Sequence, residues 1–359
     1  MKALIAMSGG VDSSVAAKLM IEEGYECVGC TMKLFHNEDA GIPKEHACCS
    51  LDDVEDARVV AYSLGMPHYV FNFSEDFKEK IIEKFVCSYE AGLTPNPCID
   101  CNRYMKFDKL YERAKLLNCE YVVTGHYARI EYDIETKKYL LKKAVDDTKD
   151  QSYVLYTMTQ DQLAHTKYPL GGLTKVETRA IAEKNGFVNA HKADSQDICF
   201  VPNGDYAAVI EQHRGTPCEE GNFVDKDGKV LGRHKGIIRY TVGQRKNLGI
   251  SFAKPMYVCE IRPEDNTVVL GEAEELLSTE MDVSDVNWIS GTAPTESFRC
   301  KVKIRYRKSE EWATVIPVSE QKIHVVFDEP QRAITPGQAA VLYDGDVVLG
   351  GGVIEKYSF

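Results

Sequence analysis

The feature that most constrains the fold lies near the start of the chain, where an apolar run ends in two glycines and a helical pattern follows. Residues 3–7 are apolar, Ser-Gly-Gly occupies residues 8–10, and apolar residues then recur at helical spacing over residues 11–22. We therefore expect a strand, a glycine turn and a helix. Glycines let backbone N–H groups approach a ligand, and a helix N-terminus is partly positive, so this turn suits a phosphate group. A plain strand-to-helix turn, capped by Ser8 or Asp12, is the alternative.

Strand-like and helix-like segments alternate over the first half of the chain. Further strands are expected at residues 25–32, 67–73 and 121–125, and helices at residues 52–64, 75–89 and 104–117. Such alternation predicts an α/β fold, in which a parallel sheet is covered by helices on both faces. Ligands of these sheets bind beyond the carboxyl ends of the strands, where the loops after Met7, Met32 and Thr124 would converge.

The second half of the chain has a different texture, with glycine-punctuated, β-branched segments from about residue 215 onward. These segments, expected to be mainly β, are residues 236–242, 256–261, 300–306, 322–327 and 339–342. The acidic stretch 271–285 is expected to be a junction. The resulting division is an α/β domain over residues 1–212, a small, mainly β middle domain over 213–280, and a C-terminal barrel or sandwich over 281–359.

Composition excludes several classes of protein. The 359 residues carry a net charge of −12, so the chain does not coat nucleic acid or lipid as a polycation, and RNA contacts must use local basic patches. No apolar run approaches the roughly 18 residues of a membrane span, and the N-terminal run is too short for a signal peptide. We expect a cytoplasmic protein, in which the 12 cysteines are reactive, metal-binding or packed thiols rather than a disulfide framework.

Three cysteines stand in settings that favour thiol chemistry. Cys98 and Cys101 form a C-x-x-C in a proline-bounded loop before an expected helix, whose dipole favours a thiolate. Cys199 follows a polar loop, and a small buried packing residue is the alternative there. Cys27 and Cys30 are expected on opposite faces of a strand, so they cannot chelate one metal ion.

The other cysteines are weaker candidates for a site. Cys48 and Cys49 lie near His46, where a zinc site and an ordinary loop are both open. The remaining cysteines have no partner spacing and are expected to be packing residues: Cys87, Cys119, Cys218, Cys259 and Cys300.

Two acid-free stretches of the second half are rich in lysine and arginine. One covers residues 299–308, with Val302, Ile304 and Tyr306 between the basic residues, and the other covers residues 229–246. At strand periodicity the first stretch has one basic face and one apolar or aromatic face. Both stretches are candidates for contact with RNA phosphates, and a solvated edge strand protected by lysines is the alternative.

The sequence S-G-G-V-D-S-S over residues 8–14 resembles the pyrophosphate-binding loop of the N-type ATP pyrophosphatases. Over essentially its whole length, the chain resembles the bacterial tRNA-specific 2-thiouridylases, the MnmA family. The motifs that carry this resemblance are residues 7–14, 48–65, 94–107, 124–127, 149–152, 194–200, 241–245, 305–307 and 335–338. The resemblance implies an N-terminal parallel-sheet PP-loop (HUP-like) domain, a small mainly β middle domain and a C-terminal β-barrel.

This resemblance implies an ATP-dependent tRNA-uridine 2-sulfurtransferase that uses ATP with Mg2+. O2 of the wobble uridine would be adenylated and then replaced by sulfur, giving 2-thiouridine, AMP and pyrophosphate. Cys199 would carry the sulfur as a persulfide, and Cys101 would be the nucleophile that frees it, leaving a Cys101–Cys199 disulfide. ATP would contact Ala6, Met7, Ser8, Gly9, Gly10, Val11, Asp12, Ser13, Met32 and Gly125. The tRNA would contact Asn96, Pro97, Cys98, His126, Lys149, Asp150, Gln151, Arg305, Tyr306 and Gln338.

The implied partners are a tRNA with a wobble uridine and a persulfide donor protein, either a cysteine desulfurase or a relay protein, and the chain is expected to be a monomer without a membrane partner. The target base must be splayed out of the anticodon loop to reach the pocket.

The chain departs from the family pattern where Cys98 replaces the aspartate of N-P-D-x-x-C, which leaves Asp100 as the nearby candidate for acid–base catalysis. An alternative is that Cys98, Cys101 and Cys199 hold a [4Fe–4S] cluster with one iron open to sulfide. Two other functions stay open: another PP-loop ATP pyrophosphatase of amidating or lysidine-forming type, and a non-enzymatic RNA-binding protein with a zinc-stapled loop.

Overall fold

The N-terminal domain is built on a five-stranded parallel sheet. The computed structural model describes residues 1–35, 51–194, 198–201 and 204–355, so His46, Cys48 and Cys49 lie outside the described residues. The strand order is β3-β2-β1-β4-β7, with bounds β1 Lys2–Ala6, β2 Glu26–Lys33, β3 His68–Asn72, β4 Tyr121–Val123 and β7 Thr166–Lys167. Every pair in this sheet is parallel, which confirms the predicted α/β class.

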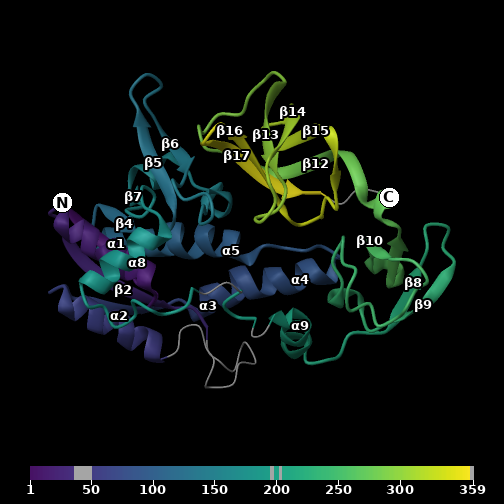
Figure 1. Cartoon of the computed structure of the whole chain (residues 1–359), viewed down its shortest axis with the longest axis horizontal. Helices are drawn as coiled ribbons and strands as arrows, with labels where there is room; N and C mark the ends of the chain where they lie inside the picture. Colours follow the sequence, from purple (N-terminus) through teal and green to yellow (C-terminus); the bar gives the residue numbers. More distant parts are fainter. Residues whose placement is uncertain (36–50, 195–197, 202–203, 356–359) are drawn as a thin grey trace.

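Helices cover both faces of this sheet (Figure 1). On one face, Ala3 and Ile5 of β1 belong to an apolar cluster with α1 (Val11–Glu22), α2 (Leu51–Ser63) and α8 (Lys175–Lys184). The alternate residue Leu4 packs on the other face, against two longer helices that each contain a π-helical part, η1 or η2. These helices comprise α3 Ser74–Phe77, η1 Lys78–Glu83 and α4 Lys84–Glu90, then α5 Pro97–Asp100, η2 Cys101–Lys109 and α6 Leu110–Leu116. None of the described helices is long and apolar enough to cross a membrane.

The predicted loop around Cys98 and Cys101 is wrong, because both cysteines lie in a helix that begins at Pro97 rather than at residue 104. Asn96 caps this helix: its side-chain oxygen accepts a hydrogen bond from the backbone N–H of Cys98 at 3.2 Å. Proline is favoured in a first helical turn because its missing N–H needs no partner there and its φ is already helical. The Asn-Pro pair is therefore a helix start.

The middle domain holds a four-stranded sheet with the order β10-β11-β8-β9. Its strands are β8 Gly221–Val224, β9 Val230–His234, β10 Tyr257–Arg262 and β11 Thr267–Gly271. Residues 236–242, expected to be β, instead contain a 3-10 turn, η5 (Ile237–Arg239), because Gly236 takes a φ of +106° and its carbonyl accepts from Arg239 N–H. The helix α9 (Tyr206–Arg214) precedes the sheet and spans the domain limit that we placed at residue 212.

The C-terminal strands close into a barrel, as predicted from the resemblance. Their order is β12-β15-β14-β13-β16-β17, and β12 also pairs with β17. The bounds are β12 Leu277–Trp288, β13 Phe298–Lys303, β14 Glu311–Ser319, β15 Lys322–Arg332, β16 Ala339–Asp344 and β17 Val347–Ile354. The predicted junction over residues 271–285 is too long, because alternate side chains of β12, including Met281 and Val283, are buried in the barrel core. Only residues 272–276 connect the two β domains.

A hairpin of the N-terminal domain extends the barrel sheet, which the sequence did not indicate. The hairpin consists of β5 (Ala128–Asp133) and β6 (Lys138–Lys143), and β6 pairs with β17 at Val347. Ion pairs strengthen the contact: Arg129 reaches Asp346 at 2.6 Å and Lys143 reaches Glu310 at 2.6 Å. In Figure 1 the hairpin stands beside the barrel, above the helices that carry the cysteines.

Among the described cysteines outside the candidate site, one differs from the sequence analysis. Cys27 and Cys30 lie in apolar clusters on opposite faces of the parallel sheet, as expected for a strand. Of the predicted packing residues, Cys119, Cys259 and Cys300 are buried and Cys218 is half-buried. Cys87 is exposed on α4, so the packing prediction is wrong for that residue.

Candidate nucleotide and thiol site

The glycine turn joins the end of β1 to the start of α1, at the carboxyl edge of the sheet. Gly9 has a φ of +76°, and a Cβ at this position would lie 2.3 Å from the carbonyl oxygen of Asp53, so only glycine fits. The Ser13 hydroxyl donates to the Gly10 carbonyl at 3.0 Å and accepts from the backbone N–H of Ser8 at 3.2 Å. The turn is thus held tightly at the N-terminus of α1, where a phosphate group would meet the helix dipole.

The remaining residues predicted to contact ATP lie around this turn. Ala6 ends β1, and Met32 is the penultimate residue of the neighbouring strand β2. Gly125 follows β4, and a Cβ there would lie 2.8 Å from the backbone of Asp12. The start of α1 and the chain after β4 are therefore in backbone contact, so the predicted set is brought together. Its contact with ATP stays a prediction.

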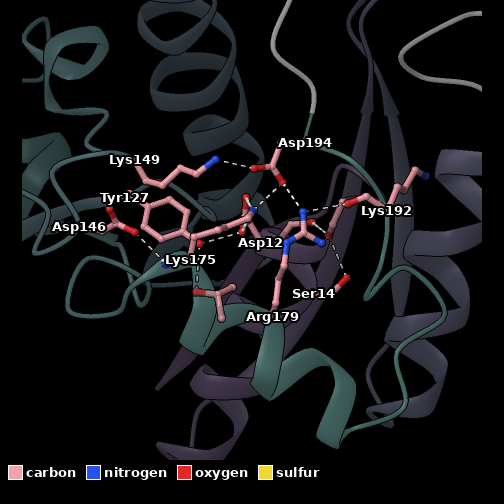
Figure 2. Close-up of polar contacts among 12 residues, drawn as sticks. Asp12, Ser14, Tyr127, Asp146, Lys149, Lys175, Arg179, Lys192 and Asp194 are labelled. Carbon is pink, nitrogen blue, oxygen red and sulfur yellow. Dashed lines mark hydrogen bonds and ion pairs between the residues drawn. The ribbon is translucent and has the colours of Figure 1, made fainter. Parts of the chain in front are cut away.

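Asp12, the acidic residue of the turn, is held by a buried lysine. The Lys175 ammonium donates to both carboxylate oxygens of Asp12, at 2.7 and 2.8 Å, and the Tyr127 hydroxyl donates to one of them at 2.9 Å (Figure 2). Only 11% of the Lys175 side chain is exposed. Lys175 lies in the first turn of α8, far from Asp12 in the sequence, so sequence analysis missed it.

Asp194 is the second carboxylate of this network and receives three cationic side chains. Lys175 reaches it at 2.7 Å, Lys149 at 2.8 Å and Arg179 at 3.0 Å. Burial acts to raise the pKa of the Asp194 carboxyl, but the hydrogen bonds from Lys149 and Lys175 lower it below its usual value. Lys149, which we predicted to contact tRNA, therefore faces the nucleotide side of the site, and Lys175 links the turn to the segment that leads to Cys199.

A further lysine holds the opposite side of the turn. Lys192 bonds to Asp53 and Asp56 of α2, each at 2.6 Å, and approaches the Gly9 carbonyl at 3.4 Å. The Asn189 amide donates to the same carbonyl at 2.9 Å. These contacts fix the backbone of the turn from outside, and no sequence motif indicated Lys192 or Asn189.

The cysteine helix approaches the same edge of the sheet, because its Lys106 lies 3.3 Å from His126, which follows β4. Cys98 is exposed, and Cys101 and Cys199 are half-buried. Burial raises the pKa of the Cys101 thiol to about 11, although the positive charge of Lys106 acts against it. Although Cys98 is exposed to solvent, desolvation of its sulfur by the surrounding atoms raises its pKa, with Lys106 again opposing. Both thiols are therefore protonated near neutral pH in this conformation.

No trio of His, Cys, Asp or Glu among the described residues is arranged to hold a metal ion. Cys98, Cys101 and Cys199 are all described, so they do not form a site for a single metal ion. The [4Fe–4S] alternative stays a prediction.

The Asp100 carboxylate is held in an ion pair, which does not favour the acid–base role that we expected. The carboxylate is buried and bonds to Lys84 of α4 at 2.7 Å. Burial raises its pKa, and the charge and hydrogen bond of Lys84 act to lower it. Its proposed acid–base role stays a prediction that the geometry does not favour.

His126, predicted to contact tRNA, lies buried between the end of β4 and the cysteine helix. Its Nδ1 is 2.6 Å from the Thr124 hydroxyl and its Nε2 is 3.3 Å from the Lys106 ammonium. Burial and the nearby charge of Lys106 hold the His126 pKa well below its usual value, so the imidazole is neutral. Lys106 was not singled out by the sequence analysis.

Two neighbouring residues predicted to contact tRNA have internal roles in this structure. The Asp150 carboxylate accepts from the backbone N–H of Ala144 at 3.0 Å and from the Ser152 hydroxyl at 2.7 Å. The Gln151 side-chain oxygen accepts from the backbone N–H of Tyr127 at 2.9 Å. Both side chains thus shape the segment that presents Lys149.

The barrel contributes its predicted tRNA residues at the contact with the N-terminal domain. Tyr306 donates to the carbonyl of Asp150 at 3.2 Å, and the Gln338 amide donates to the carbonyl of Thr94 at 2.9 Å. Arg305 donates to the carbonyls of Val242 at 2.9 Å and Ala333 at 3.3 Å, and also to the Thr335 hydroxyl. Arg305 therefore joins the middle domain to the barrel.

The predicted alternation holds for the first part of the basic stretch. Strand β13 ends at Lys303, so Arg305, Arg307 and Lys308 lie in the turn that follows rather than on the strand. Cys300, Val302 and Ile304 are buried in the barrel core, and the basic residues between them lie outside it. Some of these charges are already paired, because Arg299 bonds to Asp328 at 2.5 and 2.6 Å. The exposed Trp312 lies beside Arg299 and Lys301, an aromatic side chain in the basic face that the sequence analysis overlooked.

A parallel-sheet domain with a tight Ser-Gly-Gly turn, followed by two β domains, defines a PP-loop protein with added barrels. Family models agree: "tRNA methyl transferase HUP domain" matches residues 1–203, "tRNA methyl transferase PRC-barrel domain" residues 207–272 and "Aminomethyltransferase beta-barrel domain" residues 278–354. The chain belongs to the MnmA family of tRNA-specific 2-thiouridylases.

The relatives match over the full length. A tRNA-specific 2-thiouridylase MnmA of Clostridioides difficile is 53% identical over 99% of this chain and 98% of its own length. The protein of the same name from Acetivibrio thermocellus is 50% identical over 99% of both chains. Among solved structures, a 4-thiouridine synthetase–RNA complex with bound ATP is 18% identical and covers 59% of this chain and 50% of that chain, at a TM-score of 0.39 that supports no argument.

Proposed function

We propose that this chain thiolates tRNA at C2 of the wobble uridine, using ATP to activate the base. The observation that carries the proposal is that the Ser-Gly-Gly turn and the cysteine helix meet the same chain after β4. Gly125 touches the backbone of Asp12, and the next residue, His126, lies 3.3 Å from Lys106 of the cysteine helix. The uridine O2 attacks the α-phosphate of ATP and pyrophosphate leaves. A sulfur nucleophile then attacks C2 and AMP leaves, because the adenylated oxygen is a good leaving group.

The sulfur comes from a persulfide on Cys199, loaded by a donor protein. The Cys101 thiolate attacks the inner sulfur of that persulfide, the S–S bond breaks, and hydrosulfide leaves as the nucleophile for C2. A Cys101–Cys199 disulfide remains, and an external dithiol must reduce it before the next turnover. In this proposal the chain acts as a monomer of three domains, with the limits before α9 and at residues 272–276.

Mg2+ would accompany the phosphates of ATP, where it neutralises negative charge. Carboxylate oxygens are its usual protein ligands, and Asp12 is the carboxylate of the turn. Both of its oxygens are bonded to Lys175, so the described residues form no ready magnesium site, and we assign no step to the metal.

Product analysis with α-labelled ATP and tRNA tests the activation step. We expect labelled AMP, formed only when tRNA is present, and its loss in Asp12→Ala and Ser13→Ala. Release of ADP instead, or AMP formation that both variants retain, would show that the turn does not activate the base.

Cysteine variants test the sulfur step. Cys101→Ser and Cys199→Ser should abolish 2-thiouridine formation while a single turnover of tRNA-dependent pyrophosphate release continues, because AMP stays on the uridine until sulfur displaces it. Cys98→Ser should retain much of the thiolation. Iron counting on anaerobically prepared protein distinguishes the alternative: about four iron atoms per chain, lost in all three variants, would establish a cluster.

A further inference from the structure

The segment that leads into the cysteine helix (α5-η2-α6) is held by the barrel through both of its backbone groups. The Thr94 N–H donates to the Pro336 carbonyl at 2.9 Å, and the Thr94 carbonyl accepts from the Gln338 amide at 2.9 Å. Gly337, between these two barrel residues, has a φ of +88°, and a Cβ there would lie 2.8 Å from the Thr94 nitrogen. Thr94 lies two residues before Asn96, which caps the cysteine helix. This turn of the barrel therefore fixes the chain directly before the helix starts.

The barrel also contacts the cysteine helix within its first turns. Arg103, two residues after Cys101, bonds to Asp285 of β12 at 2.8 Å, across 182 residues of sequence. Ile99 belongs to the same buried apolar cluster as Ala339 of β16. The contacts with the barrel thus lie on both sides of the C-x-x-C in the sequence.

The backbone of β12 is distorted where this strand meets the cysteine helix. Its pairing with β17 shifts register between Ser284 and Asn287, where two residues of β12 face one residue of β17. Such a β-bulge redirects a side chain. Among the described residues, Asp285 is the only non-glycine residue with a positive φ, +49°, that lies inside a strand. Val286 stays in the barrel core, so the bulge turns Asp285 outward to Arg103.

The Arg103–Asp285 ion pair contributes little to the stability of the fold. The side chains are 35% and 49% exposed, and exposed ion pairs add little free energy. A strained backbone conformation such as that of Asp285 costs free energy and tends to occur at functional positions. A displacement of about 1 Å can slow a reaction on the order of a hundredfold, so a pair that is too weak to hold the fold can still govern the geometry of a site.

We propose that the C-terminal barrel positions the cysteine helix for the sulfur step, with Arg103 and Asp285 as positioning residues and the turn over residues 336–338 as the second attachment. This role rests on the proposed function for the attack of Cys101 on the Cys199 persulfide. Activation of the uridine at the Ser-Gly-Gly turn should proceed without these contacts. The barrel then has a part in sulfur transfer that is separate from its contacts with tRNA.

The first experiment needs no substrate and measures hydrogen–deuterium exchange of the full chain by mass spectrometry. Arg103→Met should speed exchange in peptides from residues 97–109 about fivefold, the largest change that an ion pair of this exposure supports, and leave helix α1 unchanged. Gly337→Ala should have a larger effect on the same peptides, because its Cβ would collide with the Thr94 nitrogen.

Each of these variants has a matched control in the same pair of domains. Arg129→Met removes another ion pair between an N-terminal arginine and a barrel aspartate, Asp346, at 2.6 Å. Gly345→Ala adds a Cβ at another barrel glycine with a positive φ, +59°, where nothing lies within 4 Å. Both controls should leave exchange in the cysteine helix unchanged.

The second experiment separates positioning from tRNA contact by using two sulfur sources. A cysteine desulfurase with cysteine supplies sulfur through the protein persulfide, whereas sodium sulfide supplies hydrosulfide without it. Arg103→Met should lower desulfurase-dependent 2-thiouridine formation on the order of tenfold, with an unchanged KM for tRNA. Sulfide-dependent thiolation and single-turnover pyrophosphate release should be retained. Arg103→Lys, which can still bond to Asp285, should keep most of the desulfurase-dependent rate.

The possible results are distinct. Unchanged exchange in the cysteine helix would overturn the proposal, as would an equal loss of thiolation with both sulfur sources, which would assign Arg103 to tRNA contact. If Gly337→Ala unfolds the barrel, Asp285→Asn replaces it, because asparagine tolerates a positive φ and loses only the charge. If the unsubstituted chain forms no 2-thiouridine from either source, the proposed function fails, and the exchange experiment alone decides whether the barrel holds the cysteine helix.

Discussion

Two neighbouring regions at the carboxyl edge of the parallel sheet are built in opposite ways. Around the Ser-Gly-Gly turn, charges are matched at short range: Lys175 and Lys192 each bond to two carboxylates at 2.6 to 2.8 Å. Around the cysteine helix, the Cys101 thiol has a raised pKa and Lys106 faces a neutral imidazole.

The difference indicates that the two regions act at different stages. A site that stabilises phosphate charge gains from groups that are already oriented, since no reorganisation is then needed during the reaction. Thiols are safer when they rest protonated, because the thiolate is the form that is oxidised. The groups around the turn are thus already oriented, whereas the Cys98 and Cys101 thiols rest protonated in this conformation.

Among these predictions, replacing Gly9 should have the largest effect. A small effect would contradict the view that the Ser-Gly-Gly turn is already oriented. Gly9→Ala combines a positive φ with a Cβ only 2.3 Å from the Asp53 carbonyl oxygen. We therefore expect the free energy of unfolding to fall by about 3 kcal/mol and AMP formation to be lost. Gly24→Ala is the matched control, because Gly24 also has a positive φ of +86° but nothing lies within 4 Å of the added Cβ. It should cost only about 1 kcal/mol in denaturant unfolding. Equal losses for the two variants would mean that the turn is not tightly packed.

Removing Lys175 should have the next largest effect. Lys175→Met leaves Asp12 and Asp194 without their shared cation. We expect the free energy of unfolding to fall by about 2 kcal/mol at pH 7. This loss is smaller than for fully buried ion pairs, because both carboxylates are partly exposed. Lys184→Met, an exposed position at the end of the same helix, is the control.

The effect of Lys175→Met should also depend on pH. The folded-state pKa of Asp194 is lowered, so its ion pairs stabilise the chain above the ordinary value of 3.8, and this contribution is lost as the pH falls through the lowered pKa. The difference between the variant and the unsubstituted chain should therefore shrink on acidification. A difference that grew at low pH would contradict the assigned pairing.

The smallest effect is expected at the exposed charges of the barrel. Arg307 is exposed, so Arg307→Ala should leave unfolding unchanged and reduce the log–log salt slope of tRNA binding by about one unit. Arg305 bonds to three oxygens of the chain, so Arg305→Ala should instead lower stability by about 1 to 3 kcal/mol. If Arg307→Ala leaves the salt slope unchanged, the basic stretch over residues 299–308 does not contact tRNA phosphates and only keeps this surface solvated.

The local part of this arrangement could be predicted from the sequence. Helix α1 has the predicted bounds, Val11–Glu22, because the glycines and the apolar spacing specify its start and its buried face. The start of the cysteine helix was also readable in principle, since Asn96 and Pro97 are typical cap and first-turn residues.

The rest depends on contacts that local patterns do not contain. Lys175 bonds to Asp12 across 163 residues of sequence. The residues next to either one in the sequence do not indicate this pairing. The contact of Lys106 with His126 was hidden for another reason, because residues 101–109 follow a π-helical register rather than the α-helical period that we assumed.

The pairing of the β5–β6 hairpin with the barrel also affects how the chain folds during translation. Lys143 and Gly345 touch across 202 residues, so at ribosomal rates of about 5–20 residues per second the β6 edge waits roughly 10–40 s for β17. An open strand edge invites pairing with other nascent chains, and lysines on such an edge discourage it. Lys138, Lys142 and Lys143 lie on this strand, and two of them later bond to Glu310 and Asp346 of the barrel. The same lysines can therefore discourage intermolecular pairing of this strand edge during translation and form ion pairs with the barrel once the C-terminal strands have folded.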